Sequence, residues 1–188
     1  MVLADASSSQ NDNFQFVVHT PAQKRAFFLF MEEFEPNVKL AIEAAAKSLA
    51  RCEQCRASLE RKLVQKEFDE ETIKQALDFL ESRKYLDDER YAASWIRSHC
   101  SFKPRGSIRL VRDLCARGVS RKIADEAVKA YFENVDEYEL CDSALKKLLT
   151  KNKNVKKLLK SLADSGFSYK IIQRVLKNNR VGFECDSD

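Results

Sequence analysis

Residues 59–77 read LERKLVQKEFDEETIKQAL, and two later stretches repeat their pattern. Residues 110–128 read LVRDLCARGVSRKIADEAV and residues 158–176 read LLKSLADSGFSYKIIQRVL, at offsets of 51 and 48 residues. Self-similarity at this period is typical of tandem helical repeats, whose single units are too small to bury their apolar faces alone. Such an array presents an elongated surface to a large partner and seldom holds a catalytic pocket. The matched apolar positions are Leu59, Leu110 and Leu158; Leu63, Leu114 and Leu162; Phe68, Val119 and Phe167; and Leu77, Val128 and Leu176.

Helix-capping signals recur in each repeat. The stretch 36–66 has high helix propensity and no interior Gly or Pro. Gly118 and Gly166 suit the left-handed residue that ends a helix. We therefore predict helices joined by short turns, three to a full repeat. The residues that can cap the helix N-termini are Asp69, Asp87, Ser107, Ser120 and Ser168.

The predicted fold class is mainly α: tandem three-helix repeats that form an elongated curved array, with a small N-terminal β-hairpin. The hairpin is expected at 14–18 and 25–30, two runs of aromatic and β-branched residues with turn-forming residues between them. The predicted ranges are 1–13 for a disordered tail, 14–38 for the hairpin and a linker, 39–102 and 103–153 for two three-helix repeats, and 154–188 for a partial third repeat with a C-terminal tail.

Composition is typical of a folded, helix-rich protein outside the membrane. Charged residues make up 33% of the 188 residues and hydrophobic ones 44%, with only 4 Gly and 3 Pro. The longest uninterrupted apolar run, at 26–31, is much too short to span a bilayer. Residues 1–13 contain no basic-then-apolar leader, so secretion is not expected. The six cysteines are then read as reduced thiols, and the predicted location is cytoplasmic.

The net charge of +4 is unevenly distributed. Residues 101–125 carry seven Lys or Arg against two Asp, and residues 146–180 carry eleven against one Asp, which leaves the rest of the chain at −11. A basic C-terminal part beside an acidic remainder predicts a polyanion or an acidic protein groove as the partner. The alternative, which applies above all to the lysine run at 146–160, is a solvated lysine-rich helix face.

Four segments of the chain follow the motifs of one known family. Residues 49–63 follow its opening helix, and residues 86–92, LDDERYA, match its most recognisable motif. Residues 106–118 and 167–172 match its second and third units. The chain therefore resembles the RecX family, the regulators of the RecA recombinase, and the resemblance covers residues 49–178, which is most of the chain.

Three positions depart from the family pattern. Glu67 stands where the family usually has Gly before the aromatic residue, so the first repeat must end a helix without the residue that adopts a left-handed conformation most easily. Cys55 replaces a customary Ser or Thr, and Ser107 stands where Pro is common. These positions concern caps and turns more than surface chemistry.

The resemblance implies a negative regulator of the RecA recombinase. Such a protein binds the RecA–DNA filament and inhibits its ATPase, strand exchange and filament growth. The implied partner is the RecA filament, with non-specific contact to single- or double-stranded DNA as an additional expectation. No enzymatic activity, no cofactor and no membrane are implied, and we expect a monomer.

Arginines and lysines supply the candidate contact residues. Arg105, Arg109 and Arg112 are spaced i, i+4, i+7, as on one face of a helix, and guanidinium groups bind phosphates and carboxylates with two hydrogen bonds. Lysines act as point charges that raise non-specific DNA affinity and its salt dependence. For both sets the alternative is ordinary solvated charge. The candidate partner-binding residues are Arg90, Arg97, Arg105, Arg109, Arg112, Arg117 and Arg121, and the candidate nucleic-acid-binding residues are Lys156, Lys157, Lys160, Lys170, Arg174 and Lys177.

Three other groups of residues that could suggest a functional site are better explained by a structural role. The acids at 87–89 fit the first turn of a helix, where they complement its dipole. Cys52 and Cys55 have the spacing of half a zinc site, but there is no second close CxxC pair, and in a continuous helix both would lie in an apolar stripe. Trp95 and Tyr91 have the helical spacing of core residues. We therefore predict no catalytic residue and no metal site.

A rival hypothesis, from another functional class, remains open. Three-helix units with short turns, such as residues 110–131, are also compatible with a helix-turn-helix protein that reads duplex DNA directly. Sequence-specific duplex binding separates the two readings, because the rival requires it and a filament regulator does not.

Overall fold

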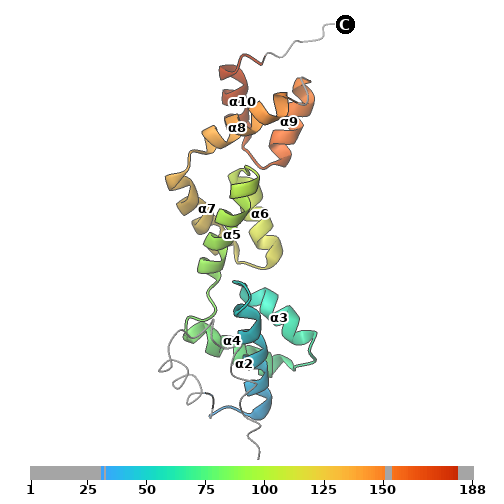
Figure 1. Cartoon of the computed structure of the whole chain (residues 1–188), viewed down its shortest axis with the longest axis vertical. Coiled ribbons are helices and arrows are strands. Elements are labelled where there is room, and N and C mark those ends of the chain that lie inside the picture. The colour runs from blue at the N-terminus through green and yellow to red at the C-terminus, as the bar shows by residue number, and fades with distance from the viewer. Residues whose placement is uncertain (1–30, 32, 151–153, 182–188) are drawn as a thin grey trace, which may run out of the picture. The chain divides into compact units, whose positions relative to one another are not determined.

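The computed structural model describes residues 31, 33–150 and 154–181, and all regular elements within them are helices (Figure 1). The chain divides into two compact units, the first ending at Tyr91 and the second beginning at Ala92. Within the described ranges no helix is long and apolar enough to cross a membrane.

The expected N-terminal β-hairpin is not supported. The described ranges contain no strand, and the segments 14–18 and 25–30 that were expected to form it lie outside them. Toward the end of the range 14–38, Met31 is helical and only 4% exposed, and a helix begins at Pro36. A short apolar run does not by itself distinguish a strand from a buried helix. Here Met31 packs into a core made by helices.

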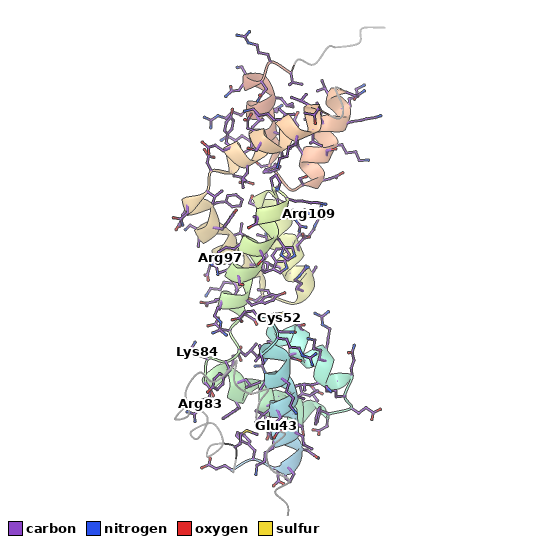
Figure 2. All side chains as sticks on the ribbon, viewed as in Figure 1. Glu43, Cys52, Arg83, Lys84, Arg97 and Arg109 are labelled. Carbon is purple, nitrogen blue, oxygen red and sulfur yellow. The ribbon has the colours of Figure 1, made fainter. Side chains whose placement is uncertain are left out.

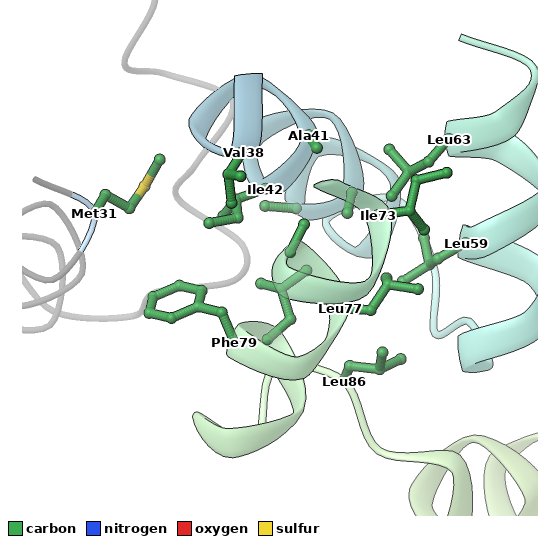
Figure 3. Close-up of a cluster of buried hydrophobic side chains, with 14 residues drawn as sticks. Met31, Val38, Ala41, Ile42, Leu59, Leu63, Ile73, Leu77, Phe79 and Leu86 are labelled. Atoms are coloured by element: carbon green, nitrogen blue, oxygen red, sulfur yellow. The ribbon is translucent and has the colours of Figure 1, made fainter. Parts of the chain in front are cut away.

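Among its described residues, the first unit is built mainly on three helices: α2 (Pro36–Leu49), α3 (Arg56–Val64) and α4 (Glu70–Ser82). Their apolar faces form one core, in which Leu59 and Leu63 point from α3 toward Ile73 of α4 (Figure 3). Full burial of a Leu side chain contributes about 1.5–3 kcal/mol, so these contacts hold the three helices together.

The high helix propensity of residues 36–66 does not produce one continuous helix. α2 ends at Leu49 and α3 begins at Arg56, and Cys55 before it has an extended backbone with φ −86° and ψ 159°. The Cys55 side chain is completely buried, whereas Cys52 is exposed. The break lets α3 fold back against α4, which a straight helix over 36–66 could not do. Propensity was outweighed by the burial of two separate apolar faces.

The second unit contains six helices among its described residues. They are α5 (Asp88–Phe102, whose first turn belongs to the first unit), α6 (Ser107–Arg117), α7 (Arg121–Asn134), α8 (Glu137–Leu149), α9 (Val155–Asp164) and α10 (Tyr169–Asn178). The last three share one hydrophobic core. The sequence ranges assign α8 to the second repeat, whereas its buried Cys141, Ala144 and Leu145 pack with α9 and α10.

The repeat predicted from the sequence is present in the helices. Of the twelve matched apolar positions, eleven are at most 4% exposed, and Phe68 is partly buried against the core of the first unit. α3, α6 and α9 occupy equivalent places in the pattern, and so do α4, α7 and α10.

The three copies end their first matched helix in the same way. Glu67, Gly118 and Gly166 all have positive φ, at 64°, 99° and 87°. The amide of the next residue bonds the carbonyl five residues back in each copy: Phe68 to Leu63 at 3.3 Å, Val119 to Leu114 at 3.2 Å, and Phe167 to Leu162 at 3.3 Å. This is the helix-ending motif that favours glycine. Glu67 therefore adopts the left-handed conformation despite its side chain.

Four of the five predicted N-terminal caps are confirmed. The side chains of Asp69, Asp87, Ser120 and Ser168 accept hydrogen bonds from amides two or three residues later. The prediction for Ser107 is wrong, because Ser107 is already the first residue of α6 and Gly106 precedes the helix.

The N-terminus of α6 is instead completed by other helices of the second unit. The Gly106 amide donates to the Ser165 carbonyl at 2.9 Å, and the Ile108 amide donates to the Gly166 carbonyl at 3.2 Å. The Ser107 amide donates to the Glu137 carboxylate at 2.7 Å. A Cβ added to Gly106 would lie 2.2 Å from the Gly166 oxygen, so only glycine permits this approach. The end of α9 is thus joined to the start of α6 through backbone atoms.

Candidate partner-binding surfaces

The candidate arginines do not form one helix face. α6 begins at Ser107, so Arg105 lies before the helix, and the expected i, i+4, i+7 row is not formed. The arginines separate into those engaged with protein groups and those that reach solvent. Figure 2 labels Arg97 on α5 and Arg109 on α6.

Three arginines surround Asp113 in the middle of α6. Arg105 Nη1 lies 2.6 Å from Asp113 Oδ2, and Arg109 Nε lies 3.4 Å from the same oxygen. Arg117 Nη1 donates to the Asp113 carbonyl at 3.0 Å. Asp113 is 18% exposed and Arg105 22%, so this pair is shielded from much of the solvent. The cluster gives these arginines a structural role.

Two of these guanidinium groups also lie against the Trp95 ring. Arg117 Cζ is 4.5 Å from the ring centroid and Arg105 Cζ is 5.8 Å from it, both within range of a cation–π interaction. Trp95 is 7% exposed and stacks on His99 at 4.0 Å, so the prediction that Trp95 is a core residue is confirmed. Arg109 Nη1 donates to the Asp164 carbonyl at 2.7 Å, which ties α6 to the end of α9.

Arg90 is likewise engaged, within the first unit. Its Nε donates to Glu53 Oε1 at 2.7 Å, and its two terminal nitrogens donate to the carbonyls of Lys84 and Tyr85 at 3.1 and 3.0 Å. The side chain is 43% exposed, yet all three nitrogens have protein partners. Arg90 therefore holds the turn before α5 in place.

Arg97, Arg112 and Arg121 are exposed candidates that, among the described residues, make no side-chain hydrogen bond or ion pair to another helix. All three are exposed, and Arg121 pairs only with Asp125 on its own helix, at 2.8 Å. Among the described residues the side chains of Arg97 and Arg112 make no hydrogen bond or ion pair. These guanidinium groups are available to an anionic partner.

The six candidate nucleic-acid-binding residues are all exposed. Lys156, Lys157 and Lys160 belong to α9, while Lys170, Arg174 and Lys177 follow one another along α10 at i, i+4, i+7. Arg174 Cζ lies 5.0 Å from the centroid of the Tyr138 ring, and this contact orients its guanidinium group. Two helices of one bundle thus carry a set of solvated cations.

The acids at 87–89 serve the helices. Asp87 Oδ1 accepts the amides of Glu89 and Arg90, both at 3.0 Å. Asp88 Oδ1 accepts the amide of Arg56, the first residue of α3, at 2.8 Å. Burial raises the pKa of Asp88, and the hydrogen bond from the Arg56 amide opposes this shift. In the described ranges no group of three His, Cys, Asp or Glu side chains could hold a metal ion.

Sequence reasoning missed a groove between α6 and α7. It encloses about 820 Å³, and its lining includes the exposed Ile108. The available signal was Ile108 beside Arg112 at i, i+4, an apolar residue on a face assigned to arginines. The central role of Asp113 was also missed, although an acid flanked by arginines at i−4 and i+4 predicts ion pairing on a helix.

Comparisons with known proteins agree with this architecture. Residues 41–80 match the first three-helix domain of RecX, and residues 87–128 match the second. The chain is 34% identical over 142 residues to "Regulatory protein RecX" of Chlorobaculum tepidum, covering 73% of this chain and 86% of the relative. With the protein of the same name from Treponema pallidum it is 30% identical over 132 residues, covering 70% and 80%.

The fold is shared with a solved structure. The crystal structure of RecX from Lactobacillus salivarius superposes with a TM-score of 0.69 at 22% identity, covering 78% of this chain and 98% of that one. Two matched three-helix domains, identities of 30% and above over most of both chains, and a common helical fold lead to one conclusion: the chain belongs to the RecX family of regulatory proteins.

Proposed function

We propose that this protein is a negative regulator of the RecA recombinase, which binds the RecA–DNA filament and inhibits its ATPase, strand exchange and filament growth. Membership of the RecX regulatory family supports the partner. The observation that carries the mode of binding is the set of exposed cations on α9 and α10. With them go the exposed guanidinium groups of Arg97 and Arg112, which have no side-chain partner among the described residues.

Electrostatics gives these cations a role in filament binding. A nucleoprotein filament presents phosphates along its length, and each Lys or Arg that neutralises a phosphate releases bound counterions. Cations spread over successive helices contact a long polyanion at several points, which strengthens binding without a deep pocket. A protein held along the filament in this way blocks the addition of subunits and the movements that accompany ATP hydrolysis.

The arginines divide between two tasks in this proposal. Arg90, Arg105, Arg109 and Arg117 are positioning residues, because they hold carboxylates, carbonyls and the Trp95 ring. Arg97, Arg112 and Arg121 are the candidates for contact with the recombinase. The cations of α9 and α10 are the candidates for non-specific contact with DNA.

Two observations weigh against the helix-turn-helix rival. The second helix of such a motif enters the major groove, yet the exposed charges of α7 are three basic and three acidic residues. The acids would face DNA phosphates and oppose binding. The amides at the start of α6, which could otherwise bind phosphate, are bonded to Ser165, Gly166 and Glu137.

The first test is RecA ATPase on single-stranded DNA, with the protein titrated in at moderate salt. Inhibition at well below one molecule per RecA supports regulation by capping of filament ends, whereas inhibition only near equal amounts supports binding along the filament. No inhibition at any ratio, together with clear binding to duplex DNA alone, would favour the rival.

A matched pair of variants tests the assignment of the arginines. Arg97→Ala with Arg112→Ala removes two exposed groups that have no side-chain partner among the described residues, and weaker inhibition by a folded protein is expected. Arg51→Ala is the control, because Arg51 is an exposed arginine of the first unit and outside the candidate set. Equal inhibition by both variants and wild type would remove Arg97 and Arg112 from the contact surface.

A further inference from the structure

The groove between α6 and α7 is an open surface of the second unit that the cationic candidates do not account for. Its volume is about 820 Å³. Eleven of the residues that line it come from α6 and α7, and the twelfth is Glu137 of α8. Glu137 accepts the hydrogen bond from the Ser107 amide at the start of α6. That bond joins the start of α6 to the start of α8 at this end of the groove.

Apolar side chains form the floor of the groove. Val111 and Val128 are nearly buried, at 8% and 4% exposed, and Phe132 lies beside them in the lining. Ile108 is 58% exposed at the same place. Covering an exposed isoleucine beside an apolar groove with a partner side chain is favourable, because it removes apolar surface from water.

The rims of the groove carry charges from both helices. Arg121 and Asp125 pair with each other, and the Glu137 carboxylate is occupied by the Ser107 amide. Among the described residues, the side chains of Arg112 on α6 and Lys129 on α7 make no hydrogen bond or ion pair. The same holds for Glu133, so two cations and one anion remain to be matched.

We propose that this groove docks an amphipathic helical segment of the recombinase, with its apolar face on Ile108, Val111 and Phe132 and acidic side chains beside Arg112 and Lys129. An amphipathic helix in an apolar groove is a recurring mode of protein recognition. Two cations, one on each rim, against the single anion of Glu133 favour a helix with acidic side chains. The inference rests on the proposed function, because it takes the recombinase as the partner. It adds a protein–protein contact to the electrostatic binding of DNA.

Cysteines provide a direct probe of groove occupancy. Cys115 lines the groove and is partly exposed, whereas Cys52 is exposed in the loop between α2 and α3 of the first unit. The full-length protein is alkylated with N-ethylmaleimide, with and without RecA filaments formed on single-stranded DNA, and modification is followed peptide by peptide. Slower alkylation of Cys115 with unchanged alkylation of Cys52 is expected.

A matched pair of substitutions tests the energetics. Ile108→Glu places a charge on the apolar floor and should weaken filament binding by about tenfold or more, as for a central interface residue. Val64→Glu is the control, since Val64 is also 58% exposed but lies on α3. Lys129→Glu, made as a separate variant, should also weaken filament binding, and its effect should be larger at low salt.

The outcomes separate the inference from the proposed function. If the wild type inhibits RecA while Cys115 reacts at an unchanged rate and Ile108→Glu binds like Val64→Glu, the groove inference is overturned and the proposed function stands. Protection of Cys115 by single-stranded DNA alone would identify nucleic acid as the occupant of the groove. Protection at a higher concentration of the protein alone would identify a second copy. Either result also overturns the groove inference. A wild type that neither binds nor inhibits the filament overturns both.

Discussion

The carboxylate of Asp88 accepts a hydrogen bond from the backbone amide of Arg56, at 2.8 Å. The amide of Arg56 is the first of α3, and Cys55 before it offers no side-chain cap. One repeat later, Glu137 accepts the amide of Ser107, the first residue of α6, at 2.7 Å. In both places a carboxylate from the first turn of a later helix satisfies the amide that begins an earlier one.

Replacement of Asp88 should show that its oxygen atom matters more than its charge. Asp88→Ala leaves the Arg56 amide without its acceptor and should lower the free energy of unfolding by about 1–2 kcal/mol. Asp88→Asn keeps an oxygen in place and should lower it much less, because burial already disfavours the charged form and raises the pKa of Asp88. Urea denaturation of both variants measures the difference. Equal losses would show that the charge, and not the acceptor, stabilises α3.

Glu67→Gly is expected to stabilise the protein. Glu67 has φ 64°, a conformation that costs a residue with a side chain about 1 kcal/mol and that glycine adopts freely. Allowing for the greater chain entropy of glycine in the unfolded state, we expect a gain of about 0.5–1 kcal/mol by urea denaturation. Gly118→Ala, the reverse change at the matched position, should destabilise by a similar or larger amount. A loss of stability in Glu67→Gly would show that the Glu67 side chain contributes more than its backbone costs.

Asp113→Ala should lower the free energy of unfolding by about 1–3 kcal/mol, because it leaves Arg105 and Arg109 without a shared carboxylate in a partly shielded site. Asp125→Ala is the control. The ion pair of Asp125 with Arg121 is exposed, since 51% of the Asp125 side chain and 75% of the Arg121 side chain are accessible. This pair should contribute less than about 1 kcal/mol to the free energy of unfolding. Thermal or urea denaturation compares the two variants. Similar losses for both would show that burial does not distinguish these ion pairs.

Alkaline pH should destabilise the second unit through Cys141. Burial, with the nearby Glu137 and Asp142, raises the pKa of this thiol from 9.0 to about 12. Between these values the folded chain binds more protons than the unfolded chain, so the stability due to the neutral thiol is complete below pH 9 and is lost as pH rises toward 12. The stability of Cys141→Ala should therefore depend less steeply on pH in this range. Identical slopes in urea denaturation would contradict the assignment to Cys141.

The cations of α9 should control the salt dependence of DNA binding. Changing Lys156, Lys157 and Lys160 to Ala should reduce the slope of log affinity against log salt on single-stranded DNA, by about 0.7 for each lost phosphate contact. The control variant changes three exposed lysines of the first unit, Lys47, Lys66 and Lys74, to Ala. Equal slopes for wild type and both variants would leave the α9 lysines as solvated charge.

The sequence predicted the repeat because that signal is local and redundant. The same helices are predicted by twelve apolar positions, by four caps and by two glycines. An error at one of these positions therefore leaves the predicted helices unchanged. The break at 50–55 was not predicted, since it depends on α3 packing against α4, and this contact joins residues far apart in the chain. The N-terminal hairpin is not supported, since the described residues contain no strand and the segments 14–18 and 25–30 lie outside them.

The candidate site was less predictable than the fold. Spacing predicted a helix face of Arg105, Arg109 and Arg112, but Arg105 precedes α6. Spacing also could not show that Arg109 would bond Asp164 and that Arg117 would lie against Trp95. These partners are brought together by packing between helices. The cations of α9 and α10 are exposed because their positions fall between the buried residues of each helix, and their contact with nucleic acid stays a prediction.

The backbone junction between α6 and α9 has a consequence for synthesis of the chain. The amides of Gly106 and Ile108 find their acceptors only in Ser165 and Gly166, more than 50 residues later. As the protein leaves the ribosome, the start of α6 therefore stays incomplete until almost the whole chain has emerged. Folding of the second unit is thus coupled to the last helices to be made, and a chain that terminates before them leaves the amides of Gly106 and Ile108 without their protein acceptors.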